Sequence, residues 1–220
     1  MASAENTQPV LTPEARRAKR MSIICLLLMV LGSIGLDQIS KTHAQKSLMV
    51  WSDPKDLAGY QGQRFPLWSS NVVAEQTGEE QSFVSIGTNY VRNLGAAWGA
   101  LASLPNGVRV PFFYFVTFLA VVIILMYMRS TPVHHRLAIF ALALILSGAV
   151  GNFIDRFRFG YVIDWIDVRW SVLGWRYDFP NFNIADSSIS VGVALLLVDM
   201  AFFERGRAER NVRAATATTA

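Results

Sequence analysis

The sequence predicts an all-α membrane protein with four transmembrane helices and a small extramembrane β platform. The 220-residue chain is 52% hydrophobic and only 16% charged, whereas a typical soluble domain carries about 25% charged residues. Its apolar residues are concentrated in four runs, each long enough to be considered as a bilayer span. Between the first two runs, QSFVSIGTNYV alternates in the manner of a strand. These blocks favour a membrane protein over a large soluble core.

The four apolar runs differ in how cleanly they end. The first is uncharged over residues 21–36, and its extension to residue 40 reaches the roughly 20 residues that cross a bilayer. The second and third are uncharged throughout, and the fourth begins and ends close to an aspartate. The predicted spans are residues 21–40, 110–128, 137–154 and 183–203.

The remaining segments are expected to lie outside the bilayer. Residues 42–109 form a mixed segment in which we expect β structure, with a strand at 81–91. Residues 158–182 form a second such segment, rich in Gly and aromatic residues and able to act as a lid. The predicted domain organisation is a tail at 1–20, a four-span domain at 21–203 and a tail at 204–220.

Basic residues predict the orientation of the spans. The N-terminal tail, the RSTPVHHR linker and the C-terminal tail are all basic, and such segments usually stay in the cytoplasm. Both termini are then cytoplasmic, and 42–109 and 158–182 lie on the outer side. The net charge of +4 is explained by this pattern, and no RNA or DNA motif accompanies it.

Three carboxylates lie in or beside otherwise apolar sequence: Asp155, Asp164 and Asp186. Carboxylates at membrane depth are costly, and they are usually functional. Asp155 follows Asn152 by three residues, and Asp186 follows Asn183 by three, so each pair shares a helix face. Capping and packing are the alternative roles for either pair. The predicted orientation places Asp155 and Asp186 at the outer ends of their spans.

Two further polar features are expected at the same level. Asp37 and Lys41 are four residues apart at the end of the first span and can form an ion pair. This pair is either interfacial, with Lys41 snorkelling to water, or buried as support for a site. Asn93, before a run of small residues, either binds a substrate backbone or caps a local turn. Asp199, near the end of the fourth span, is expected at the interface.

The acidic residues indicate paired-carboxylate chemistry. The histidines, His43, His134 and His135, are not placed to activate a serine, and neither a zinc-binding helix nor a phosphate-binding loop is present. Two close carboxyl groups share a proton, so one can activate water while the other donates to a carbonyl. Spacing leaves the partner of Asp186 open between Asp155 and Asp164, although Arg156 would hold Asp155 in an ion pair.

A function of another class remains as the alternative. A proton-coupled carrier or a binding protein could use the same acidic cluster. A carrier needs polar groups near the bilayer midplane or a continuous path across it, and the second and third spans are almost wholly apolar through their centres.

Five motifs occur in order along the four spans: DQISK, NLGAAWG, GNFIDR, GYVIDWI and FNIADSS. Together they resemble the lipoprotein signal peptidases (signal peptidase II), and the resemblance covers about residues 21–203. It implies an aspartic endopeptidase of the bacterial inner membrane, with its active site at the periplasmic face and a β cradle on the membrane. The enzyme would remove signal peptides from prolipoproteins, cutting just before a cysteine that carries diacylglycerol.

The resemblance also implies which residues form the site. Asp164 and Asp186 match the two catalytic aspartates of the family. No metal or cofactor is implied, and the expected partners are diacylglyceryl prolipoproteins and membrane lipid, with the enzyme a monomer. Two departures are Leu94, where the family commonly has Thr, and residues 52–80, which look like an insertion. The residues that match the supporting or substrate-binding positions of the family are Asp37, Lys41, Asn93, Asn152, Asp155, Arg156 and Asn183.

Overall fold

The computed structural model describes residues 12–49, 62–73, 80–96, 100–132, 135–172 and 175–204. Several predictions lie outside these ranges. They concern most of the N-terminal tail, residues 52–61 and 74–79 of the suspected insertion, His134, and the C-terminal tail from residue 205.

Four helices form the body of the molecule, and each contains a stretch long and apolar enough to cross a membrane. The four predicted spans are therefore confirmed as helices within the described residues. The first helix is longer at both ends than the predicted span, because its polar flanks continue the helical hydrogen bonding. The helices are α1 (Pro13–Leu48), α2 (Asn106–Ser130), α3 (Arg136–Phe159) and α4 (Ile184–Asp199), which continues as the π-helical turn η2 (Met200–Glu204).

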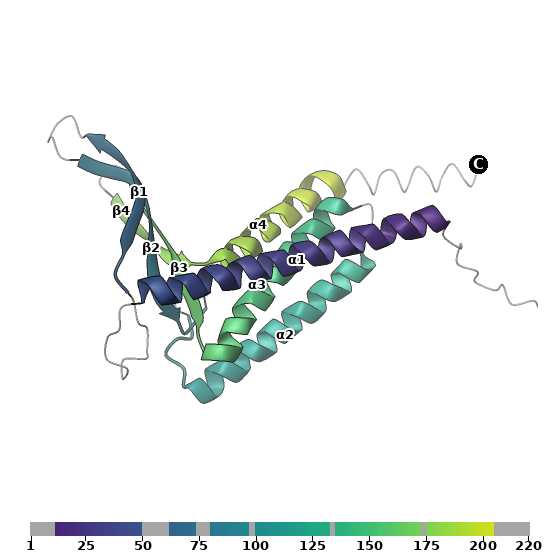
Figure 1. The fold of residues 1–220 in the computed structure, drawn as a ribbon, viewed down its shortest axis with the longest axis horizontal. Helices are drawn as coiled ribbons and strands as arrows, with labels where there is room; N and C mark the ends of the chain where they lie inside the picture. Colours follow the sequence, from purple (N-terminus) through teal and green to yellow (C-terminus); the bar gives the residue numbers. More distant parts are fainter. Residues whose placement is uncertain are drawn as a thin grey trace, which may run out of the picture.

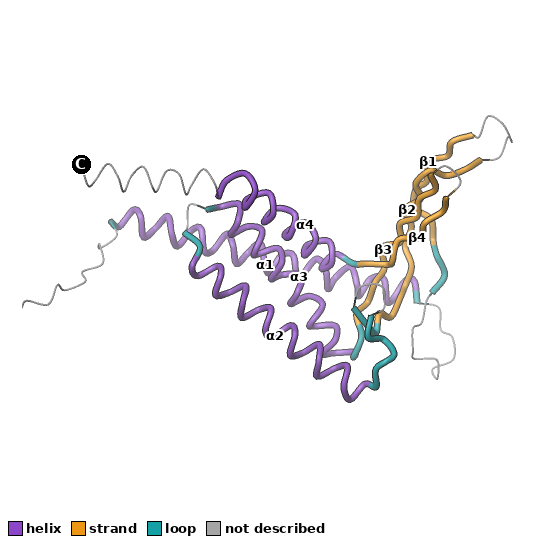
Figure 2. Tube along the Cα trace, turned by 180° about the vertical axis from the view of Figure 1, so that it is seen from behind, coloured by secondary structure: helices purple, strands orange, loops and turns teal. Residues whose placement is uncertain are grey.

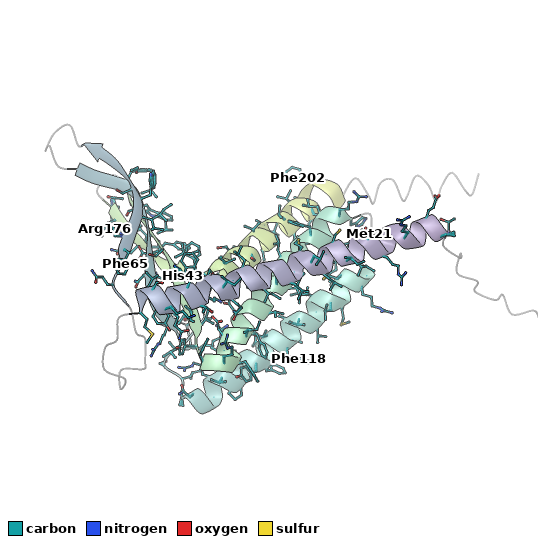
Figure 3. The ribbon with its side chains drawn as sticks, viewed as in Figure 1. Met21, His43, Phe65, Phe118, Arg176 and Phe202 are labelled. Carbon is teal, nitrogen blue, oxygen red and sulfur yellow. The ribbon has the colours of Figure 1, made fainter. Side chains whose placement is uncertain are left out.

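Helix α3 lies at the centre of the bundle and packs against the other three (Figure 1). Small residues on α3 allow this close approach, as is usual between helices in lipid. At Gly148, an added Cβ would lie 2.3 Å from the carbonyl oxygen of Ala185 on α4. The outer faces of the bundle carry exposed apolar side chains such as Leu31 and Phe118, and Figure 3 shows Phe118 on the outer side of α2. These faces suit contact with lipid tails.

A four-stranded antiparallel sheet in the order β1-β2-β3-β4 lies at one end of the helices (Figure 2). The strand predicted at 81–91 is confirmed as part of β2. The structure adds β1, which falls entirely inside the suspected insertion, and two strands from the segment at 158–182. The strands are β1 (Phe65–Val73), β2 (Glu80–Asn93), β3 (Val162–Val172) and β4 (Trp175–Phe182).

The connection between the bundle and the sheet positions the candidate site. Helix α3 ends at Gly160, whose φ of 78° is in the left-handed region that glycine tolerates best, and β3 begins two residues later. Strand β3 then pairs with β2, so that Asp164 lies opposite Val91 and Val162 lies opposite Asn93. Two segments about 70 residues apart in sequence thus meet beside the helix ends.

The two ends of the described chain lie together at the other end of the bundle. In Figure 3, His43 and Phe65 mark the sheet end, whereas Met21 and Phe202 lie at the opposite end.

Asp199, which we expected at the interface, is buried, with 4% of its surface exposed. The helical chain continues past it into η2, in keeping with a predicted span that runs to residue 203.

Candidate active site

Asp164 and Asp186, here called the acidic pair, line the same cavity of ≈ 990 Å³. Asp164 lies near the start of β3 and is 2% exposed. Asp186 lies in the first turn of α4. Asp155, the other candidate partner of Asp186, does not line this cavity. The structure therefore brings Asp164, rather than Asp155, to the cavity together with Asp186.

Each carboxylate of the acidic pair accepts two N–H hydrogen bonds. Asp164 accepts from Asn93 Nδ2 at 2.9 Å and from Asn183 Nδ2 at 2.7 Å. Asp186 accepts from Asn152 Nδ2 at 2.7 Å and from the backbone nitrogen of Asn183 at 3.2 Å. Three asparagines from β2, α3 and the start of α4 thus orient the two carboxylates. Buried carboxylates need such donors to remain in place without water.

Asn183 has a local structural role as well as a contact with the site. It is the N-cap of α4, with its Oδ1 accepting from the backbone nitrogen of Asp186 at 2.9 Å, and Asp186 completes a reciprocal capping box. The structural alternative for this Asn-x-x-Asp pair is therefore confirmed. Because the cap also fixes the first turn of α4, it places Asp186 at the cavity.

Asn93 stabilises a local turn, one of the two roles between which its spacing left a choice, and it also contacts the acidic pair. Its Oδ1 accepts from the backbone nitrogen of Gly95 at 2.9 Å and so stabilises a local turn. Its Nδ2 meanwhile donates to Asp164. The turn therefore determines which way the amide points, and the amide then orients the carboxylate.

Asp37, Lys41 and Asp155 form a buried ionic cluster behind the acidic pair. Each residue is 1% exposed. Lys41 Nζ lies 2.9 Å from Asp37 Oδ2, 3.0 Å from Asp155 Oδ2 and 3.0 Å from Asn152 Oδ1. The interfacial alternative for Asp37 and Lys41 is therefore wrong, because α3 and α4 cover both residues. Charges buried this deeply are tolerated when every group has partners of this kind.

The two carboxylates of this cluster hold the backbone next to the acidic pair. Asp155 Oδ2 accepts from the backbone nitrogen of Ile163 at 3.0 Å, and Ile163 directly precedes Asp164. Asp37 Oδ1 accepts from the backbone nitrogen of Ala185 at 2.9 Å, and Ala185 directly precedes the other member of the acidic pair. Since Lys41 bridges Asp37 and Asp155, one cation ties together the starts of β3 and α4.

The sequence led us to expect that Arg156 would hold Asp155 in an ion pair. In the structure Arg156 instead faces the cavity. Its Nη2 donates to the carbonyl oxygen of Gly95 at 3.0 Å, and its guanidinium carbon lies 4.4 Å from the ring centroid of Phe113. Neighbouring side chains on a helix point in different directions, so Asp155 faces Lys41 while Arg156 faces the cavity.

Gln38 is a polar member of the site that the sequence analysis did not single out. Its Nε2 donates to Asp155 Oδ1 at 2.9 Å and to the carbonyl oxygen of Gly151 at 3.2 Å. It lies three residues before Lys41 inside DQISK, so helical spacing could have identified it. Deeper in the bundle, hydroxyl groups of Ser33 and Ser147 lie 3.0 Å apart, and single serines in apolar runs carry no pattern that predicts this contact.

Asp164 is expected to carry a proton near neutral pH. Burial in the site and, to a smaller extent, the nearby charge of Asp186 raise its pKa to about 7, against the opposite effect of the hydrogen bonds from Asn93 and Asn183. Burial disfavours the charged form of a carboxyl group, and a second carboxylate does the same. The acidic pair therefore suits a state in which one proton is held between two carboxyl groups.

This pKa predicts a dependence of stability on pH. The folded-state pKa of about 7 lies above the usual value of 3.8 for an aspartate, so between these values the folded protein binds more protons than the unfolded chain. The free energy of unfolding should then fall as pH rises through this window and level off above it. We expect Asp164→Asn to lack this slope.

Thermal unfolding in detergent at about pH 5 and about pH 8 measures the effect. Asp178→Asn is the matched control, because the Asp178 side chain is 56% exposed on β4, and its pH dependence should equal that of the wild type. An Asp164→Asn variant with the wild-type slope would contradict the assignment of the titrating group.

The cavity joins this polar group to an apolar wall. Its polar lining includes the acidic pair, Asn93, Asn152 and Arg156. In its apolar lining, α2 contributes side chains at helical spacing, Phe113, Val116 and Ala120, and α4 contributes Ile189. A ligand with both a polar backbone and an apolar portion fits this lining. The paired carboxyl groups can perform acid–base hydrolysis on such a ligand.

Comparison with known proteins gives a family match over most of the chain. The model of the family described as "Signal peptidase (SPase) II" matches residues 27–202. This region includes the acidic pair, the helices α3 and α4 that contact it, and all four strands.

Curated relatives show the same similarity over shorter segments. A lipoprotein signal peptidase from Syntrophus aciditrophicus is 50% identical over 111 residues, which is 50% of this chain and 66% of the relative. One from Geobacter sulfurreducens is 50% identical over 119 residues, 54% of this chain and 71% of the relative. One from Staphylococcus aureus is 35% identical over 122 residues, 56% and 69% respectively. The chain thus spans about two thirds of the length of these relatives.

Solved structures support the fold. One described as "Bacterial membrane enzyme structure by the in meso method at 2.3 A resolution" is 28% identical, with a TM-score of 0.57 over 81% of this chain and 88% of the other. A second, described in the same words at 1.9 Å resolution, is 27% identical, with a TM-score of 0.57 over 82% and 95%. The four helices with a small antiparallel sheet therefore have a counterpart among known membrane enzymes.

Proposed function

The chain belongs to the signal peptidase (SPase) II family, and from this premise we propose that it is an aspartic endopeptidase whose catalytic residues are Asp164 and Asp186. Membership of a protease family and four apolar helices make it a multi-pass bacterial membrane protease. Its proposed reaction removes the signal peptide from diacylglyceryl-modified prolipoproteins, by cleavage just before the lipidated cysteine. The convergence of the two aspartates on one cavity is the observation that carries the proposal.

The proposed reaction uses the two carboxyl groups in opposite protonation states. Asp164 carries the proton, in keeping with its pKa of about 7, and Asp186 is ionised. Asp186 takes a proton from a water molecule as the water oxygen attacks the scissile carbonyl, while Asp164 donates its proton to the carbonyl oxygen. As the intermediate collapses and the C–N bond breaks, Asp186 passes its proton to the leaving amine and Asp164 takes a proton back from a hydroxyl group of the intermediate, which restores the starting state of the pair.

The cavity supports a substrate with a peptide part and a lipid part. The asparagine amides and Arg156 lie beside the acidic pair and would position the peptide backbone or the ester groups of the lipid. The apolar wall from α2 and α4 would receive the acyl chains while they remain in the bilayer. Asp37, Lys41 and Asp155 would act from behind as supports.

The proposed location is the bacterial inner membrane, with the active site at the periplasmic face and both termini cytoplasmic. The arrangement of the described chain supports this, since its two ends lie at the end of the bundle opposite the sheet (Figure 1). According to this proposal, residues 1–20 and 204–220 are cytoplasmic tails. The peptidase acts as a monomer without a metal or cofactor.

Cleavage of a purified prolipoprotein tests the proposal. We expect the detergent-solubilised protein to cut a diacylglyceryl-modified prolipoprotein on the N-terminal side of its modified cysteine, as read by mass spectrometry. The same precursor without the lipid is the matched control and should remain uncut, because the apolar wall of the cavity then has no ligand. If the modified precursor also remains intact, the peptidase function is wrong, and proton flux in proteoliposomes would then test a carrier.

A further inference from the structure

The three asparagines that contact the acidic pair can donate only if each amide is turned the correct way round. An amide carries its acceptor oxygen and its donor nitrogen on one carbon, so half a rotation exchanges them. A rotated amide would present its oxygen to a carboxylate oxygen and lose the hydrogen bond. The orientation of each amide is therefore set by its other contacts.

Backbone groups fix two of these amides. Asn93 Oδ1 accepts from the backbone nitrogen of Gly95, and Asn183 Oδ1 accepts from the backbone nitrogen of Asp186, each at 2.9 Å. Because a backbone N–H can only donate, it holds the oxygen of each amide toward itself. The Nδ2 of Asn93 and of Asn183 is thereby turned toward Asp164.

Asn152 is held differently. In the described part of the chain, its Oδ1 accepts from Lys41 Nζ at 3.0 Å and from Asn183 Nδ2 at 3.2 Å. Asn183 Nδ2 is shared between Asn152 and Asp164, since it also lies 2.7 Å from Asp164 Oδ1. An ammonium group has three donors and no acceptor, so Lys41 tolerates only the oxygen of Asn152.

Lys41 meets three oxygen acceptors, on Asp37, Asp155 and Asn152, which equals its number of N–H donors. It is 1% exposed and does not line the cavity. Its position excludes direct contact with a ligand in the cavity, so any effect on the reaction must pass through a neighbour.

We propose that Lys41 is a positioning residue that fixes the amide of Asn152, so that Asn152 Nδ2 donates to Asp186. The chain of contacts is Lys41 Nζ to Asn152 Oδ1 at 3.0 Å, then Asn152 Nδ2 to Asp186 Oδ1 at 2.7 Å. This inference rests on the proposed function, because it assigns Lys41 a role in orienting the carboxylate that takes the proton from water.

The test requires variants in which the net charge of the buried cluster can be kept at its wild-type value. Lys41→Met alone would leave Asp37 and Asp155 buried without their cation, which is strongly destabilising. The comparison is therefore between Asp37→Asn and the double variant Asp37→Asn/Lys41→Met. The double variant loses one negative and one positive charge, so the net charge of the cluster equals that of the wild type. The amide oxygen introduced by Asp37→Asn can still accept from the backbone nitrogen of Ala185, which turns its NH₂ group toward Lys41 and removes one of the three acceptors of Lys41.

Relative to Asp37→Asn, the double variant is expected to lose about 10- to 100-fold in kcat, the range that one hydrogen bond to a charged group accounts for. Its KM should stay within about twofold, since Lys41 does not contact the ligand. Its melting temperature should fall, because Asp155 is then buried without its cation, so both rates are measured at a temperature at which both variants are folded. A rise in KM with unchanged kcat would overturn the proposal.

A double-mutant cycle shows whether the effect passes through Asn152. The same comparison is made with Asn152→Ala added to both variants, with rates taken from single turnovers. If Lys41 acts through Asn152, its loss should change kcat by less than about threefold once the amide is absent. If the loss of Lys41 lowers kcat by the same factor in both backgrounds, Lys41 acts by another route and the proposal is wrong.

A spectroscopic measurement separates this inference from the proposed function. In protein labelled with ¹⁵N-asparagine, the side-chain NH₂ signal of Asn152, assigned by its absence in Asn152→Ala, should shift between the two variants, while that of Asn93 stays in place. An unmoved Asn152 signal would overturn the orientation claim even if the wild type is active. Conversely, a wild type that does not cut the modified precursor refutes the peptidase function, whereas the Asn152 signal still decides the orientation.

Discussion

Asp164→Asn and Asp186→Asn are each expected to reduce cleavage of a diacylglyceryl-modified prolipoprotein by about 10³-fold or more, since general acid–base groups contribute 10²–10⁴-fold. An asparagine keeps the shape of the aspartate and one of its two accepted hydrogen bonds, but it cannot exchange a proton with water. Both variants should still bind the precursor, because the cavity lining is otherwise unchanged. Single-turnover cleavage and co-purification of uncut precursor measure the two effects.

Asp155→Asn and Asp178→Asn are the comparison variants for this experiment. Asp155 holds the backbone of Ile163 and Lys41 from behind the acidic pair, so its replacement should lower stability and leave residual cleavage. Asp178 is exposed on β4, and its replacement should change neither property. If Asp164→Asn cuts at the wild-type rate, the catalytic assignment fails, and Asp155 becomes the next candidate partner of Asp186.

Gly148→Ala is expected to lower the stability of the helix bundle far more than Gly32→Ala does. Its Cβ would lie 2.3 Å from the carbonyl oxygen of Ala185 and 2.6 Å from Ile189 Cγ1. A backbone oxygen cannot rotate away, so α4 must shift from α3, and overpacking of this kind costs about 1–3 kcal/mol or more. Because Ala185 directly precedes Asp186, the shift should also reduce cleavage.

Gly32→Ala is the matched control on α1, since an added Cβ there meets nothing within 4 Å. It should be neutral or slightly stabilising, because alanine favours a helix over glycine by about 1 kcal/mol. Thermal unfolding and cleavage rates of both variants measure the difference. Equal melting temperatures for the two variants would show that α4 accommodates the methyl group and would contradict the close packing of α3 and α4.

The four helices could be predicted from the sequence because their cause is local. A run of apolar residues long enough to cross a bilayer must satisfy its backbone hydrogen bonds internally, and a helix does so. The predicted start of the fourth span at Asn183 was also close to the start of the helix, since Asn183 caps α4. The extension of α1 to Leu48 was missed, because no break in hydropathy marks where a helix continues beyond the span.

The sheet could be predicted only in part. The alternation at 81–91 identified β2, but strands β3 and β4 were not assigned in the segment at 158–182. In GYVIDWI, Val162, Ile163 and Asp164 are all buried, so the segment lacks a simple inside–outside alternation. Its pairing with β2 joins residues about 70 positions apart, such as Asn93 and Asp164, and no local pattern specifies such a partner.

The sequence alone determined that this protein spans a membrane four times and places carboxylates where they are costly, because hydropathy and charge are properties of single segments. The motifs also identified the family. The tertiary structure decided which aspartate joins Asp186, where Lys41 lies and which way the asparagine amides point. These depend on contacts such as that between Lys41 and Asn152, 111 residues apart in the chain. Only the packing of α1 on α3 and the pairing of β3 with β2 bring those groups within hydrogen-bonding distance.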